Sequence, residues 1–241
     1  MHAAKPLPTP RQTNLRIPKD ASAALSNPSM YRSVVGALQY ILVTRPELSY
    51  VVNKVCQYMH DPQEHHWKAV KRILRYLVGT CSHGLLIQRS PSRDIRAFSD
   101  ADWGSDIDDM KSTTGYCVYY GPNIIAWSSH KQRVVSRSST EAEYRSIAAA
   151  LTEVIWLQSL LHELHLSSTQ PQVFSDNLGA VLLSANPIMH SRTKHFELDL
   201  HFVRDYVQQN KIRLLHLPAR FQIADTFTKP IIGPSFLEFP S

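Results

Sequence analysis

The tripeptide Phe-Ser-Asp occurs twice in this chain, at residues 98–100 and again at residues 174–176. Each copy closes a short segment of strand character, residues 95–99 in the first case and residues 172–175 in the second. If these strands are parallel neighbours, their aspartates meet at the carboxyl edge of the sheet, where α/β proteins collect ligands. Two carboxylates in one place repel each other unless a cation lies between them. The repeat therefore predicts a sheet that joins two distant segments around a metal ion.

The order of the remaining segments predicts an α/β fold. Strand character occurs at residues 84–88, 95–99, 115–120, 123–128 (with an extension toward 136), 172–175 and 211–217. Helical signals occur at residues 139–165, 177–185, 194–209 and 223–228. An antiparallel meander followed by alternating helices and strands favours a five-stranded mixed sheet flanked by helices.

The first 82 residues predict a separate helical segment. Residues 1–26 are rich in Pro, Ala and Ser, which is typical of a disordered leader. Three helices are predicted after it, at residues 27–44, 46–59 and 61–79. The third has an apolar stripe and an otherwise basic surface, which suits either solvent or a phosphate backbone. The expected organisation is a leader over 1–26, a helical segment over 27–82, a sheet domain over 83–231 and a tail over 232–241.

The charge and the cysteines of the chain indicate which kinds of partner and which kinds of site to expect. The formal net charge is +6 and the pI is about 9.3, which favours a polyanionic partner, nucleic acid before anionic membrane. The three cysteines are scattered, which argues against a disulfide framework and a cysteine zinc site. No apolar run is long enough to cross a bilayer, so no membrane association is expected.

A third and a fourth acid join Asp100 and Asp176 by different arguments. Glu143 lies at the edge of the apolar stripe of the predicted 139–165 helix, so its side chain should face the sheet. Glu141 should project away and pair with Arg145 four residues on. A capping box that begins at Thr140 and ends at Glu143 is expected to start this helix. Asp225 starts the last short helix, where an acid is also favoured simply by the helix dipole.

Several motifs taken together resemble a known family. Residues 98–103, 138–144, 174–177, 193–199 and 223–230 are similar to the ribonuclease H domain of copia-type LTR retrotransposon polyproteins. Residues 31–40, 44–46 and 74–80 resemble the segment that joins reverse transcriptase to that nuclease. The resemblance covers about residues 27–231. It implies a ribonuclease H-like fold after a helical remnant of the thumb and connection region, and it places the family's metal ligands at Asp100, Glu143, Asp176 and Asp225.

The resemblance also implies a reaction and its cofactors. The expected activity is hydrolysis of the RNA strand of an RNA–DNA hybrid by two Mg²⁺ or Mn²⁺ ions about 3.5–4 Å apart. No Tyr-x-Asp-Asp polymerase signature occurs, so DNA synthesis is not expected. The chain is expected to be a fragment of a longer polyprotein, with the rest of that polyprotein as a partner and the cytoplasm, or else the nucleus, as its location.

Substrate contacts and rival functions stay open at this stage. The candidate substrate-binding residues are Ser139, Thr140, Asn177, Lys131 and Arg133, although helix capping alone would explain the first three. His190 and His195 are both candidates for a histidine at the catalytic site or a substrate contact, with no basis for a choice. The alternative function is a catalytically inactive remnant that binds nucleic acid or another protein.

Overall fold

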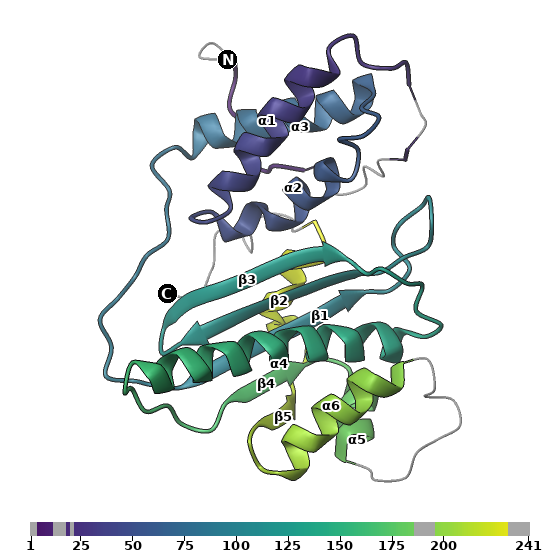
Figure 1. Cartoon of the computed structure of the whole chain (residues 1–241). Helices are drawn as coiled ribbons and strands as arrows, with labels where there is room; N and C mark the ends of the chain where they lie inside the picture. Colours follow the sequence, from purple (N-terminus) through teal and green to yellow (C-terminus); the bar gives the residue numbers. More distant parts are fainter. Residues whose placement is uncertain (1–3, 12–17, 20–21, 186–195, 231–241) are drawn as a thin grey trace. The chain divides into compact units, whose positions relative to one another are not determined.

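The computed structural model describes residues 4–11, 18–19, 22–185 and 196–230. The chain forms two compact units (Figure 1). One unit comprises Met1–Leu86, Ile107–Asp109 and Lys229–Ser241, and the other comprises Ile87–Asp106 and Met110–Thr228. His190, His195 and the expected tail at 232–241 lie outside the described residues.

The second unit is built on a five-stranded mixed sheet. Its strands are β1 (Ile95–Asp102), β2 (Thr113–Tyr120), β3 (Asn123–Lys131), β4 (Gln172–Ser175) and β5 (Arg213–His216). Their spatial order is β3-β2-β1-β4-β5. The first three strands form the antiparallel meander, whereas β4 runs parallel to both of its neighbours, β1 and β5. The predicted fold class, a mixed sheet preceded by a helical segment, is confirmed.

The two Phe-Ser-Asp copies lie side by side in this sheet. Phe98 is directly opposite Phe174 in the parallel ladder, and Ser99 is opposite Ser175. The two phenylalanine rings are stacked, with their centroids 5.1 Å apart. The predicted neighbouring strands are therefore confirmed, and the register brings the following residues of both strands to one edge.

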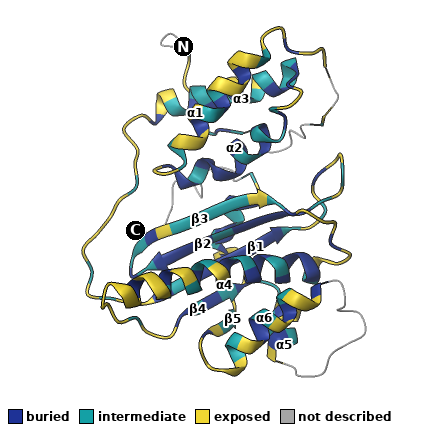
Figure 2. Cartoon of the chain, in the orientation of Figure 1, coloured by how far each residue is buried: buried dark blue, intermediate teal, exposed yellow. Residues whose placement is uncertain are grey.

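Opposite faces of the sheet are covered by different elements. Helix α4 (Ser139–Glu163) lies across one face, and its inward side is buried whereas its outward side is exposed (Figure 2). Ala97 and Val118 belong to the core beneath this helix, together with Leu151 and Val154 of the helix itself. The other face receives the 3-10 helix η4 (Ile223–Phe227), preceded by another short turn, η3 (Ala219–Phe221). Helices α5 (Leu178–Ala185) and α6 (Glu197–Gln208) complete the unit.

Residues 84–88 do not form the predicted strand. The backbone N–H and C=O of Gln88 are both bound by the side-chain amide of Asn123, at 2.7 and 2.8 Å. Leu86 and Ile87 are exposed, so burial contributes nothing that would hold a sixth strand in the sheet. Strand propensity alone was insufficient here.

The first unit is a small helical body. It contains α1 (Pro28–Ile41), η1 (Pro46–Leu48), α2 (Ser49–Cys56) and α3 (Glu64–Gly79). The side chain of Asn27 caps α1, and Gln63 is the N-cap of α3. The side chains of Gln63 and His66 bind each other's backbone N–H groups at that helix start.

Part of the predicted disordered leader is structured. The Leu7 N–H donates to the Arg75 carbonyl at 3.3 Å, and Arg72 donates to the Thr9 hydroxyl at 2.9 Å. Ala24 forms an antiparallel bridge with Gln63. Polar groups of α3 that were assigned to solvent or phosphate thus bind the chain's own N-terminal segment. Among the described helices, none combines the length and the apolar character that a membrane span requires.

Candidate active site

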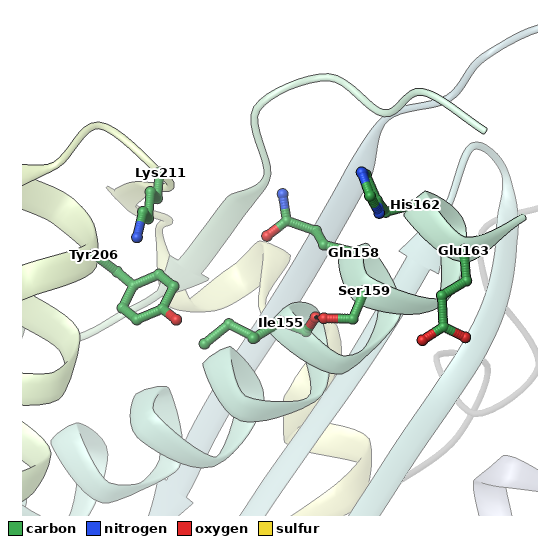
Figure 3. A pocket seen from close by; sticks show the side chains of 7 residues that line it. All are labelled: Ile155, Gln158, Ser159, His162, Glu163, Tyr206 and Lys211. Carbon is green, nitrogen blue, oxygen red and sulfur yellow. Dashed lines mark hydrogen bonds between the residues drawn. The ribbon is translucent and has the colours of Figure 1, made fainter. Parts of the chain in front are cut away.

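A surface groove and an acid cluster occur in different places on the sheet unit. The groove measures about 500 Å³ and is open to solvent (Figure 3). It is lined by Ile155, Gln158, Ser159, His162 and Glu163 of α4, with Tyr206 and Lys211 opposite. None of the four predicted acids lines it, so the groove provides no support for the metal site.

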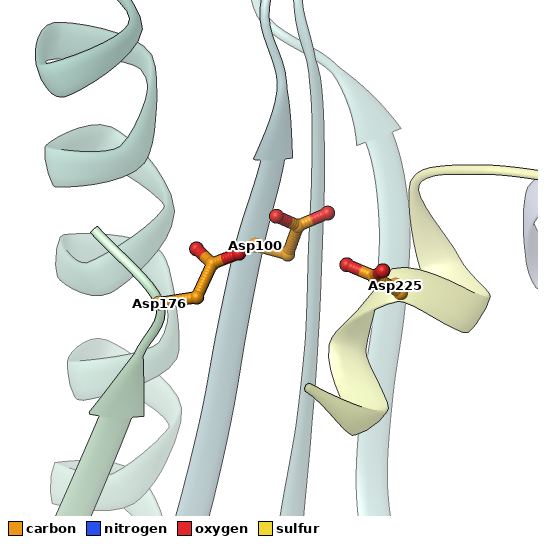
Figure 4. A group of neighbouring side chains, drawn as sticks. All are labelled: Asp100, Asp176 and Asp225. Carbon is orange, nitrogen blue, oxygen red and sulfur yellow. The ribbon is translucent and has the colours of Figure 1, made fainter. Parts of the chain in front are cut away.

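The acid cluster unites residues from three elements. Asp100 lies within β1, Asp176 follows β4 by one residue, and Asp225 lies in η4. One carboxylate oxygen from each residue lies within 4.8 Å of the others, and Asp176 and Asp225 flank Asp100 from two sides (Figure 4). Strand β1 continues to Asp102, so Asp100 is an interior strand residue and not the strand end that the sequence predicted.

Asp100 is buried and has a hydrogen-bond donor from a distant part of the chain. Only 1% of its surface is exposed, whereas Asp176 and Asp225 are partly exposed. The hydroxyl of Thr228 donates to Asp100 Oδ2. A buried carboxylate needs such donors, because it has lost the water that would otherwise solvate its charge.

Glu143, and not Glu141, approaches the cluster. The Ala101 N–H donates to Glu143 Oε1 at 3.0 Å, while Oε2 is buried without a hydrogen-bond partner. Burial raises the pKa of Glu143 to about 9, and the nearby negative charges of Asp100 and Asp176 act in the same direction. The predicted orientation of Glu143 toward the sheet is thus confirmed, as is the pairing of Glu141 with Arg145, although Glu141 is as buried as Glu143.

The start of α4 explains why Glu143 is available. The predicted capping box at Thr140 is wrong, because the N-cap is Ser138, whose hydroxyl accepts from the Glu141 N–H at 3.2 Å. Glu141 in turn accepts from the Arg137 N–H at 2.9 Å and pairs with Arg145 at 2.8 Å. Glu141 thus completes the helix start, and Glu143 has no capping role that would turn it away from the sheet.

These residues fit a hard divalent cation. Carboxylate oxygens are the ligands that Mg²⁺ and Mn²⁺ prefer, and the set contains no thiolate or imidazole. The buried Oε2 of Glu143 has no hydrogen-bond donor, and a bound cation would place a positive charge beside this atom. Within the described part of the chain, this is the one group of acids, histidines and cysteines with metal-binding spacing.

The predicted substrate contacts are placed in different ways. Lys131 forms an ion pair with the buried Asp106 at 2.9 Å, so a structural partner already occupies its ammonium group. Arg133 and Ser139 are exposed beside the start of α4. Asn177 caps α5 by accepting from the Ala180 N–H at 2.9 Å, as the capping explanation predicted.

Thr140 lies close to this second helix start. A Cβ atom placed on Gly179 would lie 3.5 Å from the Thr140 hydroxyl and 3.1 Å from the side-chain oxygen of Asn177. The starts of α4 and α5 are therefore adjacent, and Thr140 and Asn177 share one small region of surface.

Sequence reasoning missed three polar residues around the acids. Thr228 binds Asp100, and the Gln222 amide donates to the Ser99 carbonyl at 3.0 Å. The His216 ring lies 3.2 Å from the Asp176 carbonyl, from Nε2 to oxygen. Gln222 and Thr228 flank Asp225 at three residues on either side, a spacing that could have drawn attention to them. The partners of Gln222 and Thr228 are more than a hundred residues away along the chain and cannot be inferred from local pattern.

Comparison with known proteins supplies the family. No protein-family model matches the chain. Its sequence is 48% identical over 240 residues to the retrovirus-related Pol polyprotein from transposon RE2 of Arabidopsis thaliana, which is 99% of this chain and 16% of the relative. It is 35% identical over 238 residues to the corresponding polyprotein from transposon TNT 1-94 of Nicotiana tabacum, 96% of this chain and 18% of the relative.

The chain belongs to the copia-type retrotransposon Pol polyprotein family. It spans about a sixth of the length of the curated polyproteins that it matches. Among solved structures, LC11-RNase H1 in complex with an RNA/DNA hybrid gives a TM-score of 0.42 at 15% identity, over 56% of this chain and 93% of that one. Because this TM-score is below 0.5, the assignment to the Pol family rests on the sequence relatives.

Proposed function

We propose that this chain is the ribonuclease H part of a Pol polyprotein and that it hydrolyses the RNA strand of RNA–DNA hybrids. The observation that carries the proposal is the convergence of Asp100, Asp176 and Asp225 within 4.8 Å, with the unpartnered Oε2 of Glu143 beside them. Family membership supports the choice of this chemistry over other metal-dependent hydrolyses.

The acids are proposed to hold two Mg²⁺ or Mn²⁺ ions. When bound, such ions lower the pKa of a water molecule and stabilise the leaving oxygen of a phosphodiester. The chain's contribution is to orient the ligands: β1 holds Asp100, α4 brings Glu143, and the loop after β4 brings Asp176. Asp225 completes the set from η4 on the face opposite α4.

Nucleic-acid contacts are proposed around the starts of α4 and α5. Arg133 and Ser139 are exposed there and could reach a phosphate, and Thr140 and Asn177 lie together at the adjoining surface. Lys131 is a weaker candidate than Arg133, because its ion pair with Asp106 would have to break first. The remainder of the polyprotein is proposed as the natural partner.

The test is hydrolysis of a labelled RNA–DNA hybrid by the purified chain with Mg²⁺ or Mn²⁺. We expect cleavage of the RNA strand that stops when the metal is chelated, and no cleavage by Asp100→Asn or Asp176→Asn. A folded wild-type chain that does not cleave would refute the proposal and favour the inactive remnant. If Asp100→Asn and Asp176→Asn both cleaved as fast as the wild type, the site assignment would instead be refuted.

A further inference from the structure

Thr228 joins two of the acids that the proposed function requires. Its hydroxyl donates to Asp100 Oδ2, while its backbone N–H donates to the Asp225 carbonyl at 3.2 Å. The residue is fully buried, so water does not compete for either bond. One side chain therefore attaches the turn that carries Asp225 directly to the carboxylate at the centre of the cluster.

An aspartate needs such a partner in order to present its oxygens in one direction. Rotation about its terminal torsion is broad, because a carboxylate has no sharp staggered wells. A hydrogen bond from a fixed donor removes this freedom. Thr228 is itself restricted, since a β-branched side chain has few allowed rotamers.

The methyl group of Thr228 also has a close neighbour in the sheet. It packs above Gly115, which lies opposite Asp100 in the β1–β2 ladder. A Cβ atom at Gly115 would come within 2.6 Å of this methyl group and within 2.7 Å of Phe227 Cβ. Because Gly115 has no side chain, the turn can pack closely against β2 at this point. This packing sets the position of the Thr228 hydroxyl.

A second side chain fixes the other end of the same turn. Gln222 donates to the Ser99 carbonyl at 3.0 Å and accepts from the Ala224 N–H at 3.2 Å. Asp225 is therefore fastened to β1 on both sides, by Gln222 before it and by Thr228 after it. Only Thr228 also touches an acid side chain.

We infer that Thr228 is a positioning residue of the metal site, which orients the Asp100 carboxylate and holds Asp225 beside it. This inference rests on the proposed metal-binding role of the acids. Partners that orient a ligand typically change metal affinity or activity by about 10–100-fold when they are removed. We expect Thr228→Val, which keeps the shape and loses the donor, to weaken metal binding by about that factor.

The experiment measures Mn²⁺ affinity of the full chain by calorimetry, with hybrid cleavage and the metal-free melting temperature recorded in parallel. Thr228→Ser retains the donor and should restore most of the affinity. Thr152→Val is the matched control, because its hydroxyl binds only the Ala148 carbonyl at 2.9 Å on the solvent side of α4. We expect Thr152→Val to bind Mn²⁺ as the wild type does.

If Thr228→Val does not fold, Thr228→Ala and Thr228→Ser give the same information, since they differ by one oxygen atom. Equal Mn²⁺ affinity of the wild type, Thr228→Val and Thr228→Ala would overturn the inference, as would equal losses of affinity in Thr228→Ser and Thr228→Ala. A wild type that binds no Mn²⁺ would overturn it together with the proposed function. A wild type that binds Mn²⁺ but does not cleave refutes only the function, because the affinity comparison remains valid.

Discussion

Asp100 and Asp225 reach the same cluster on supports of different kinds. Asp100 belongs to the eight-residue strand β1, which is hydrogen-bonded to β2 on one side and to β4 on the other. Asp225 belongs to the five-residue turn η4, whose bonds to the sheet come from side chains. They include the bonds from Gln222 to the Ser99 carbonyl, from Thr228 to Asp100, and from Ser129 to the Phe227 carbonyl at 2.6 Å.

The difference predicts where the site is vulnerable. A strand inside a sheet is held by many backbone bonds, so one substitution rarely displaces it. A short turn that depends on a few side chains can move while the rest of the unit stays folded. Substitutions around the turn should therefore separate activity from stability, whereas those around β1 should affect mainly stability unless they alter the acid itself.

The largest effect is expected from Asp100→Asn. Cleavage should fall by more than about 100-fold, since a ligand contributes at least as much as a residue that orients it. Without metal, however, the variant should be more stable than the wild type, because one of the mutually repelling charges is gone. Thermal melting checks this: adding Mg²⁺ should raise the midpoint of the wild type and leave that of the variant unchanged. A metal-free variant less stable than the wild type would contradict the expected repulsion.

Gly115→Ala is expected to displace the turn. The new methyl group would meet Thr228 and Phe227 at less than 3.0 Å, and overpacking of this kind costs about 1–3 kcal/mol. We expect the cleavage rate to fall by a larger factor than the loss of folded protein explains. Urea unfolding of the same variant gives the folded fraction for this comparison. Gly36→Ala in α1 is the control, because nothing lies within 4 Å of its new atom and alanine favours a helix. Unchanged cleavage by Gly115→Ala would show that the turn can shift without disturbing the acids.

Ser146→Ala tests the strand-held side of the comparison. The Ser146 hydroxyl lies 2.7 Å from the Asp100 carbonyl and 3.1 Å from the Gly115 carbonyl, and it is fully buried. Its loss should cost about 1 kcal/mol of unfolding free energy. Cleavage at saturating metal should stay close to that of the wild type, because the ladder still holds Asp100. A large drop in the cleavage rate of a variant that is still fully folded would mean that β1 is less rigid than its backbone hydrogen bonds suggest.

Ser129→Ala should give the smallest effect and the opposite balance. It removes one partly buried bond to the Phe227 carbonyl, so the unfolding free energy should change by less than about 1 kcal/mol. Because that bond holds the turn, the cleavage rate at limiting metal should fall although the protein remains folded. Cleavage rates of Ser146→Ala and Ser129→Ala at two Mg²⁺ concentrations compare the strand that holds Asp100 with the turn that holds Asp225. If Ser146→Ala and Ser129→Ala behave alike, the distinction between the supports is wrong.

Local pattern was sufficient where neighbours along the chain set the outcome. Helix phase separated Glu143 from Glu141, because side chains three or four residues apart share a face. The repeated tripeptide correctly indicated two neighbouring parallel strands. Asp176 could be placed beside Asp100 for the same reason, since matching register brings equivalent positions to one edge.

Local pattern failed where distant groups competed for the same backbone. Residues 84–88 have strand character, yet the side chain of Asn123 takes the polar groups of Gln88 that a neighbouring strand would have paired. Helix α4 begins at Ser139 as predicted, but the expected capping box at Thr140 does not form, because the Ser138 hydroxyl provides the cap. In both cases a hydrogen bond that the sequence pattern does not reveal decided the result.

The sequence by itself determined most element types, the exception being residues 84–88. It also determined the mixed sheet, the neighbouring Phe-Ser-Asp copies and the orientation of Glu143, because these depend on periodicity and short-range geometry. Only the tertiary structure decided how Asp225 is held. Thr228 and Asp100 are 128 residues apart, and their contact depends on the missing side chain of Gly115 and on the packing of a short turn against the sheet. Such a contact forms because folding brings those surfaces together, so no local pattern along the chain encodes it.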